Sequence, residues 1–144
     1  MFIRFIFSKL FGLVELGPYL YAVGGSQSIG SQMSIERFDG TKWEEVGETN
    51  GYRQDFCSLA WGDDGILAIG GYDELGGETR TELYNITTNS WTLLQEMDIG
   101  RGMHACAHYE GGVAVAGGWT FNNDPDFPGQ EVTRTSAWLE LVRK

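Results

Sequence analysis

Several kinds of residue are scarce in this 144-residue sequence, and each shortage excludes a class of protein. Only two cysteines occur, Cys57 and Cys106, and neither belongs to a CxxC pair or a Cys/His cluster. A zinc site or a disulfide scaffold is therefore not indicated, and no metal is expected. Both cysteines are expected to act as small hydrophobic residues of strands.

Basic residues and long hydrophobic runs are also scarce. Ten Lys and Arg face 20 Asp and Glu, which gives a net charge of −10 with no local basic cluster. Binding to nucleic acid or to a membrane surface is therefore not expected. The apolar start, MFIRFIFSKLFGLVEL, is interrupted by Arg4 and Lys9 and lacks a small-residue cleavage site. It predicts neither a membrane span nor a signal peptide, and we expect a cytoplasmic location.

Glycine, in contrast, is abundant, and its placement is periodic. Three diglycines begin 46 and then 47 residues apart, and each follows an apolar run. Each is followed by an aromatic residue, and in the first two units by a Trp. The third unit carries seven extra residues within FNNDPDFPGQ, as a surface loop tolerates. The repeat positions are Gly24 and Gly25 with Phe38 and Trp43; Gly70 and Gly71 with Tyr84 and Trp91; and Gly117 and Gly118 with Trp138.

Each unit is predicted to be a four-stranded antiparallel sheet. In the second unit the strands are DFCSLAWG, GILAIGG, RTELYNI and SWTLLQ, with turns at DDG and TTN. No segment shows helical periodicity, so the chain is predicted to be all-β. A sheet of this size cannot bury both faces alone, so the copies must stack face to face, as propeller blades do. The glycines are expected where a neighbouring backbone comes close, and the aromatics between the blades.

These residues resemble the kelch repeat. The resemblance rests on the apolar run, the diglycine, ERFD or ELYN, and then Trp43 or Trp91, with Arg53 and Arg101 opening the next unit. The segment RGMHACAHYEGGVAVAGG of the third unit also fits the pattern, and the match covers residues 18 to 142. It implies an incomplete kelch-type β-propeller of about three four-stranded blades, in units of about 18–50, 51–98 and 99–144. Residues 1–17 form an N-terminal segment without an assigned structure.

Two departures from the kelch pattern affect the ends. The first unit lacks an opening Arg and a convincing first strand, and the third stops before a fourth strand. We therefore expect one complete blade and two partial ones. Kelch propellers usually have five to seven blades, so the chain is predicted to be a fragment, or to complete its ring through further blades or self-association. An alternative is that FIRFIF, residues 2–7, supplies the missing outer strand of the third unit.

No catalytic residue or cofactor is expected. His104 and His108 lie four residues apart in a predicted strand, which separates them by about 13 Å, too far for joint metal ligation. The recurring Arg53 and Arg101 are interpreted as ties between blades. Their candidate partners are Glu36 and Glu82, each two residues before the repeat aromatic.

The loops after the diglycines are the candidate binding elements. They vary in length and composition while the strands keep their spacing, and binding residues are often carried by loops on a rigid scaffold. Tyr72, Trp119 and Phe121 are aromatic residues suited to anchoring a partner. The alternative is that these side chains pack against neighbouring loops.

The predicted function is protein binding. The resemblance implies binding of a protein or peptide through propeller loops, and within that use, substrate recognition in a ubiquitin-ligase adaptor. Two alternatives remain, part of a kelch-fold oxidase or carbohydrate-active enzyme, and an actin-binding protein. We expect a non-enzymatic role.

Overall fold

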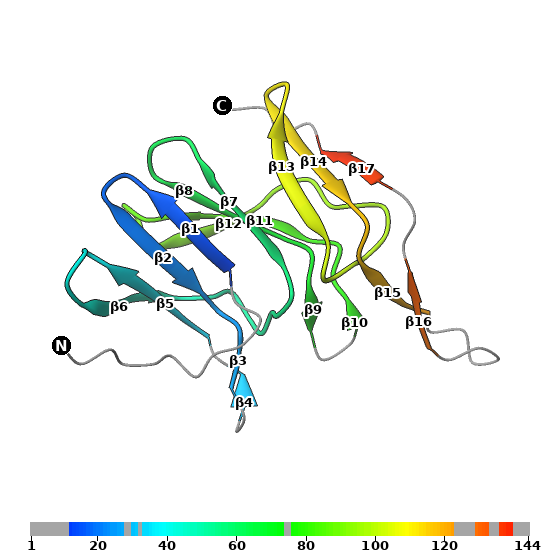
Figure 1. The fold of residues 1–144 in the computed structure, drawn as a ribbon, viewed down its shortest axis with the longest axis horizontal. Helices are drawn as coiled ribbons and strands as arrows, with labels where there is room; N and C mark the ends of the chain where they lie inside the picture. Colours follow the sequence, from blue (N-terminus) through cyan, green and yellow to red (C-terminus); the bar gives the residue numbers. More distant parts are fainter. Residues whose placement is uncertain are drawn as a thin grey trace.

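The computed structural model describes residues 12–27, 30–31, 33–73, 76–122, 129–132 and 136–139. Within these residues the chain forms strands and turns only, with no helix, which confirms the all-β prediction. Three antiparallel sheets stand side by side as blades (Figure 1). Residues 2–7, proposed as an outer strand of the third blade, lie outside the described residues.

The first two blades have four strands each, ordered as a meander, and the described part of the third has three. Blade 1 consists of β1 (Gly12–Leu16), β2 (Tyr19–Val23), β5 (Ser34–Phe38) and β6 (Trp43–Glu48). Blade 2 consists of β7 (Cys57–Trp61), β8 (Gly65–Ile69), β11 (Thr81–Asn85) and β12 (Ser90–Leu93). Blade 3 consists of β13 (Ala105–Tyr109), β14 (Gly112–Ala116) and β17 (Ser136–Leu139).

The strands of blade 2 match the sequence prediction, but blade 1 corrects it. The first unit was predicted to lack a first strand, and residues 1–17 were set apart from the repeats. The structure forms β1 within that segment and pairs it with β2. Its side chains alternate, with Val14 and Leu16 buried and Leu13 and Glu15 exposed. This period of two is sufficient for a half-buried strand, and it needs no opening arginine.

The blades pack face to face through two apolar clusters. In β8 the alternate residues Ile66 and Ala68 join the cluster shared with blade 1, while Leu67 and Ile69 join the one shared with blade 3. A strand points successive side chains to opposite faces, so blade 2 is covered on both sides. This is the face-to-face stacking that the repeat predicted.

The register of blade 3 also corrects one assignment. Tyr84 of blade 2 pairs with Ile66, and the corresponding residue of β14, Val113, pairs with Leu139. Leu139 therefore takes the position of the repeat aromatic, and Trp138 pairs with Ala114 instead. Counting from the diglycine placed the aromatic one residue too early, because the enlarged loop changes the spacing before β17.

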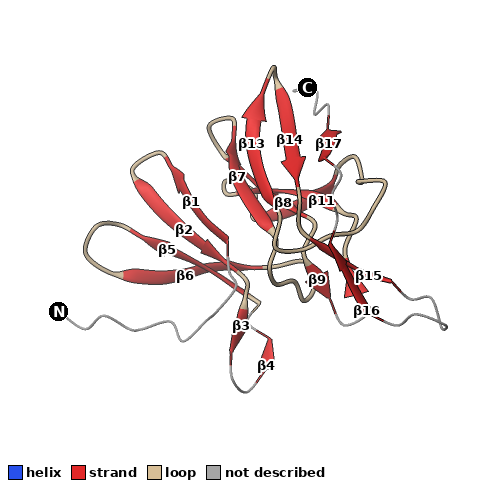
Figure 2. Ribbon diagram, turned by 45° about the vertical axis from the view of Figure 1, so that its right-hand side comes forward, coloured by secondary structure: helices blue, strands red, loops and turns tan. Residues whose placement is uncertain are grey.

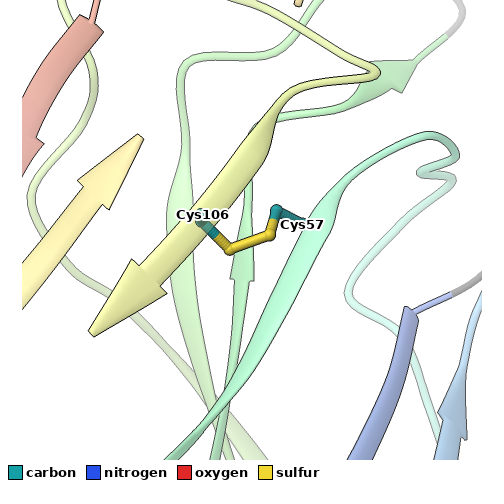
Figure 3. The surroundings of a disulfide bond; sticks show 2 residues. All are labelled: Cys57 and Cys106. Carbon is teal, nitrogen blue, oxygen red and sulfur yellow. A yellow bond between two sulfur atoms is a disulfide. The ribbon is translucent and has the colours of Figure 1, made fainter. Parts of the chain in front are cut away.

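The two cysteines form a disulfide, contrary to the sequence prediction. Cys57 of β7 is bonded to Cys106 of β13, with their Cα atoms 6.0 Å apart (Figure 3). The expectation of two small hydrophobic thiols was therefore wrong. The first strands of neighbouring blades run beside one another, and this brings the two sulfur atoms face to face.

Candidate binding surface

The connections that follow the diglycines are the first part of the candidate site. Each forms a small two-stranded ribbon, and the three ribbons project from the same end of the blades (Figures 1 and 2). The ribbons are β3 (Ser26–Gln27) with β4 (Gly30–Ser31), β9 (Tyr72–Asp73) with β10 (Gly76–Gly77), and β15 (Trp119–Asn122) with β16 (Gly129–Val132).

The diglycines hold the ribbon ends of neighbouring blades together. Gly71 N–H donates to Arg101 O of blade 3 at 2.7 Å. Gly70 has a φ of +59°, and a Cβ atom there would lie 2.6 Å from the same oxygen. Only glycine combines this backbone conformation with such a close approach. The structure thus shows, at the second diglycine, the neighbouring backbone that the sequence analysis expected.

Arg53 pairs with the predicted partner Glu82, but the arginine side chains do not join the blades. Arg53 was expected to tie blade to blade, but its buried side chain bonds within its own blade, to Ala68 O at 3.0 Å and to Glu82 Oε2 at 2.6 Å. Burial lowers the pKa of Arg53, and the Glu82 carboxylate opposes that shift. The tie between blades is made by the carbonyl of Arg53, which accepts from Gly25 N–H at 3.4 Å.

Arg101 follows the same arrangement, while Glu36 does not. The buried side chain of Arg101 donates to Gly117 O of its own blade at 3.0 Å, and its carbonyl accepts from Gly71. Glu36, the other predicted partner, accepts a bond from Ser34 Oγ at 3.3 Å. The recurring arginine therefore fixes the shape of each opening segment, and the main chain of that segment joins the blades.

The repeat aromatics pack toward the outer side of the junction. Tyr84 is buried and lies 5.2 Å from Trp91, measured between ring centroids. The Trp91 indole donates to Glu48 O of β6 at 2.9 Å, which joins the outer strands of blades 1 and 2. The indole N–H of Trp91 is thus bonded to a main-chain carbonyl of the neighbouring blade. Trp43 stacks on Phe38 of its own blade at 5.2 Å.

The predicted loop anchors have different environments. Tyr72 is only 4% exposed, and its hydroxyl donates to Trp119 O at 2.8 Å. Burial raises its pKa, and the nearby Asp55 carboxylate adds to that effect. Tyr72 is therefore a buried residue that holds the main chain of Trp119 in place, and it is not available to contact a partner. Trp119 is 37% exposed and remains available for contact. Phe121 belongs to β15, but its side chain lies outside the described residues.

Two further exposed apolar residues lie in the segment that opens the third unit, and the sequence analysis missed both. The main chains of Gly102 and Trp119 pair through two 2.9 Å hydrogen bonds. Met103, the next residue, is 57% exposed, and Ile99 of the same opening segment is exposed as well. We call Ile99, Met103 and Trp119, together with the ribbon β9–β10, the ribbon-end surface. The sequence signal for Ile99 and Met103 was the presence of apolar residues in the loop before the first strand of a repeat.

Buried polar groups support this surface from within. His104 is buried, and its pKa is lowered to about 4, first by burial and then by the charge of Arg101. A neutral imidazole therefore lies beneath the diglycine, where a Cβ atom at Gly70 would come within 2.8 Å of His104 Cε1. Among the described residues there is no group of three His, Cys, Asp or Glu arranged to hold a metal ion, and no helix could cross a membrane.

The stacked blades and their diglycine junctions define a protein built from kelch repeats. A kelch motif is recognised at residues 56–98, which contain the four strands of blade 2. The chain therefore contains a kelch motif, as the resemblance implied.

Curated relatives include Kelch-like protein 36 of Rattus norvegicus and of Mus musculus, each 32% identical over 117 residues. The Bos taurus protein of the same name is 31% identical over the same length. These alignments cover 76% of this chain and 19% of each relative. The chain thus corresponds to about a fifth of the length of these relatives.

Proposed function

We propose that the chain is a protein-binding module that holds a peptide segment of its partner at the ribbon-end surface. The observation that carries this proposal is the placement of exposed Met103 and Trp119 on main-chain segments that are hydrogen-bonded to each other. Exposed Met and Trp side chains are typical of protein contacts, because each supplies a large apolar area.

The main chain that carries these exposed side chains is held by hydrogen bonds, and this favours a binding role for them. Tyr72 is buried under the ribbon and fixes the carbonyl of Trp119, while Gly71 is hydrogen-bonded to Arg101 of the opening segment. A surface whose backbone is held in place loses little conformational entropy when a partner binds. The rigid blades thus supply the scaffold, and the ribbons supply the variable contacts.

The charge of the chain favours a basic partner. The net charge is −10, and Asp73 of the ribbon β9–β10 lies at this end of the blades. We propose that the bound segment combines Lys or Arg with an apolar or aromatic anchor. Its association should slow as salt is added, because screening weakens long-range attraction.

Selection from a random peptide-display library on the immobilised chain tests this function. Enriched peptides should carry basic residues, and Trp119→Ala should weaken their binding about tenfold or more. Tyr109→Ala is the matched control, because Tyr109 is an exposed aromatic at the β13–β14 turn, away from the ribbons (Figure 1). Equal losses in the two variants, or no enrichment, would contradict the proposal.

We also propose, on the family resemblance, that the bound segment belongs to a protein destined for ubiquitination and that the chain itself is not an enzyme. Once a partner is identified by display, its abundance in cells should rise when the chain is overexpressed, because the chain would compete with the intact adaptor. The Trp119→Ala chain should not raise it. An unchanged partner abundance would remove the adaptor role and leave peptide binding standing.

A further inference from the structure

The disulfide occupies a contact that recurs between blades. By pairing register, Gly12 of β1 corresponds to Cys57 of β7, and Ser58 of β7 corresponds to Cys106 of β13. A Cβ atom at Gly12 would lie 2.5 Å from Ser58 Oγ, so these two residues meet across the junction of blades 1 and 2. The same contact is covalent between blades 2 and 3, where Cys57 and Cys106 meet.

The covalent junction is the one beneath the ribbon-end surface. Blades 2 and 3 also meet through Gly71 and Arg101, and through the Tyr72 hydroxyl and Trp119 O. These ties lie at the ribbon end, next to the point where β13 begins. The disulfide extends the same connection along β7 and β13 (Figure 3).

The disulfide is also within reach of solvent. Both Cys57 and Cys106 are half-buried, and Cys106 packs at the edge of the apolar cluster shared by blades 2 and 3. A thiolate must approach a sulfur atom directly for exchange to occur, so access decides whether a disulfide can be reduced in the folded state. A pair enclosed in the apolar core would be protected from that attack.

We propose that the Cys57–Cys106 disulfide is a thiol-sensitive lock that holds blade 3, and with it the ribbon-end surface, against blade 2. Reduction uses two equivalents of a small thiol or one dithiol. A thiolate attacks one sulfur and forms a mixed disulfide, and a second thiolate displaces the remaining cysteine. Both cysteines are then thiols, and the reductant, having given up two electrons, is released as its own disulfide.

Reduction leaves the junction of blades 2 and 3 with non-covalent contacts, as at the junction of blades 1 and 2. Blade 3 should then open more often, because the cross-link no longer limits its separation from blade 2. The junction of blades 1 and 2 has Gly12 and Ser58 in place of the cysteines and should not respond. The chain therefore contains its own internal control.

Hydrogen exchange of the intact chain, with and without dithiothreitol, tests the lock. After reduction, amides of β13 and β14 should exchange at least tenfold faster, while those of β2 and β5 keep their rates. The variant Cys57→Ala with Cys106→Ser should exchange as the reduced chain does in both conditions. Serine is the residue that the chain itself carries at the corresponding position, Ser58.

Three results would overturn the lock: unchanged exchange in β13 and β14 after reduction, an equal increase in β2 and β5, or two free thiols after incubation with oxidised glutathione. Reduction of the wild-type chain keeps the test valid even if the double variant does not fold. The effect on peptide binding rests on the proposed function. If no peptide binds while the exchange difference persists, the proposed function fails and the lock stands.

Discussion

At the scale of single residues, burial decides how the charged and titratable groups of the junctions behave. His104 is held neutral among Gly70, Arg101 and Gly118, and burial together with the Arg101 charge lowers its pKa from 6.5 to about 4. In the unfolded chain the imidazole returns to an ordinary pKa and takes up a proton more readily. The unfolded state therefore binds more protons between these two values.

Stability should consequently fall as the pH is lowered from 6.5 to 4. The contribution of His104 is fully present above pH 6.5 and is lost by about pH 4, with a total loss of about 3 kcal/mol. Urea unfolding at a series of pH values measures it. His104→Gln should remove this part of the pH dependence, whereas His108→Gln should keep it. The same slope in wild type and His104→Gln would show that His104 is not held neutral.

The buried ion pair gives a second prediction at this scale. Arg53→Ala should destabilise the chain by about 3 to 5 kcal/mol, because Glu82 would stay buried with its neutral partner Asn50 and the more distant Arg80. Arg37→Ala breaks a solvent-accessible pair with Glu44 and should have little effect. Chemical denaturation of both variants gives the comparison. A small effect of Arg53→Ala would mean that Arg80 or water can replace the guanidinium.

At the scale of the elements, the diglycines show how one sequence signal can have two structural consequences. Gly70 and Gly117 have similar φ values, +59° and +70°. A Cβ atom at Gly70 would meet Arg101 O, but no described atom lies within 4 Å of a Cβ atom at Gly117. Backbone conformation and close packing are therefore separable in this chain.

Gly70→Ala and Gly117→Ala should accordingly differ in cost. Both place a side chain in the left-handed region, at about 1 to 2 kcal/mol. Gly70→Ala adds an overlap with main chain, so its total should be about 3 kcal/mol or more. Thermal unfolding of the two variants measures the difference. Equal destabilisation would show that the conformation alone explains the glycines.

The elements also show what the sequence could predict. The four strands of blade 2 were predicted because each combines an apolar pattern with a clear turn at its end. β1 was not predicted, because the first unit lacks the opening arginine of the kelch pattern, although GLVEL alternates as a half-buried strand should. The burial of Tyr72 could not be predicted from the sequence, because its ring packs against Gly102 of the next blade. Met103, in contrast, could have been predicted, because it is an apolar residue in the loop before a first strand.

At the scale of the whole molecule, the disulfide follows from the repeat, although the sequence analysis missed it. Cys57 corresponds by register to Ala105, which lies 48 residues further along the chain. Cys106 is one residue beyond, so its side chain points to the opposite face of its blade. A separation of one repeat plus one residue therefore makes two strand residues face each other across a junction. The number of cysteines alone does not show that the two side chains face each other; their separation along the chain does.

The cross-link should determine how the molecule unfolds. Closing a segment of 49 residues restricts the unfolded chain and contributes about 4 kcal/mol in the loop-entropy description. Stacked repeats contact only their neighbours, so the loss of one junction is felt locally. In the oxidised chain, urea should unfold blades 2 and 3 in a single transition.

In the reduced chain, blade 3 should unfold first, at lower urea, because non-covalent contacts alone hold it to blade 2. The exposed Trp119 reports on blade 3 by fluorescence, and circular dichroism reports on all three blades. The two signals should coincide in the oxidised chain and separate after reduction. A Trp119→Phe chain should keep the circular dichroism curve and lose only part of the early fluorescence change, because Trp61 stacks on His108 of blade 3 and Trp138 belongs to β17. Coincident transitions in the reduced chain would mean that the apolar cluster around Leu67 and Val115 is enough to couple the two blades.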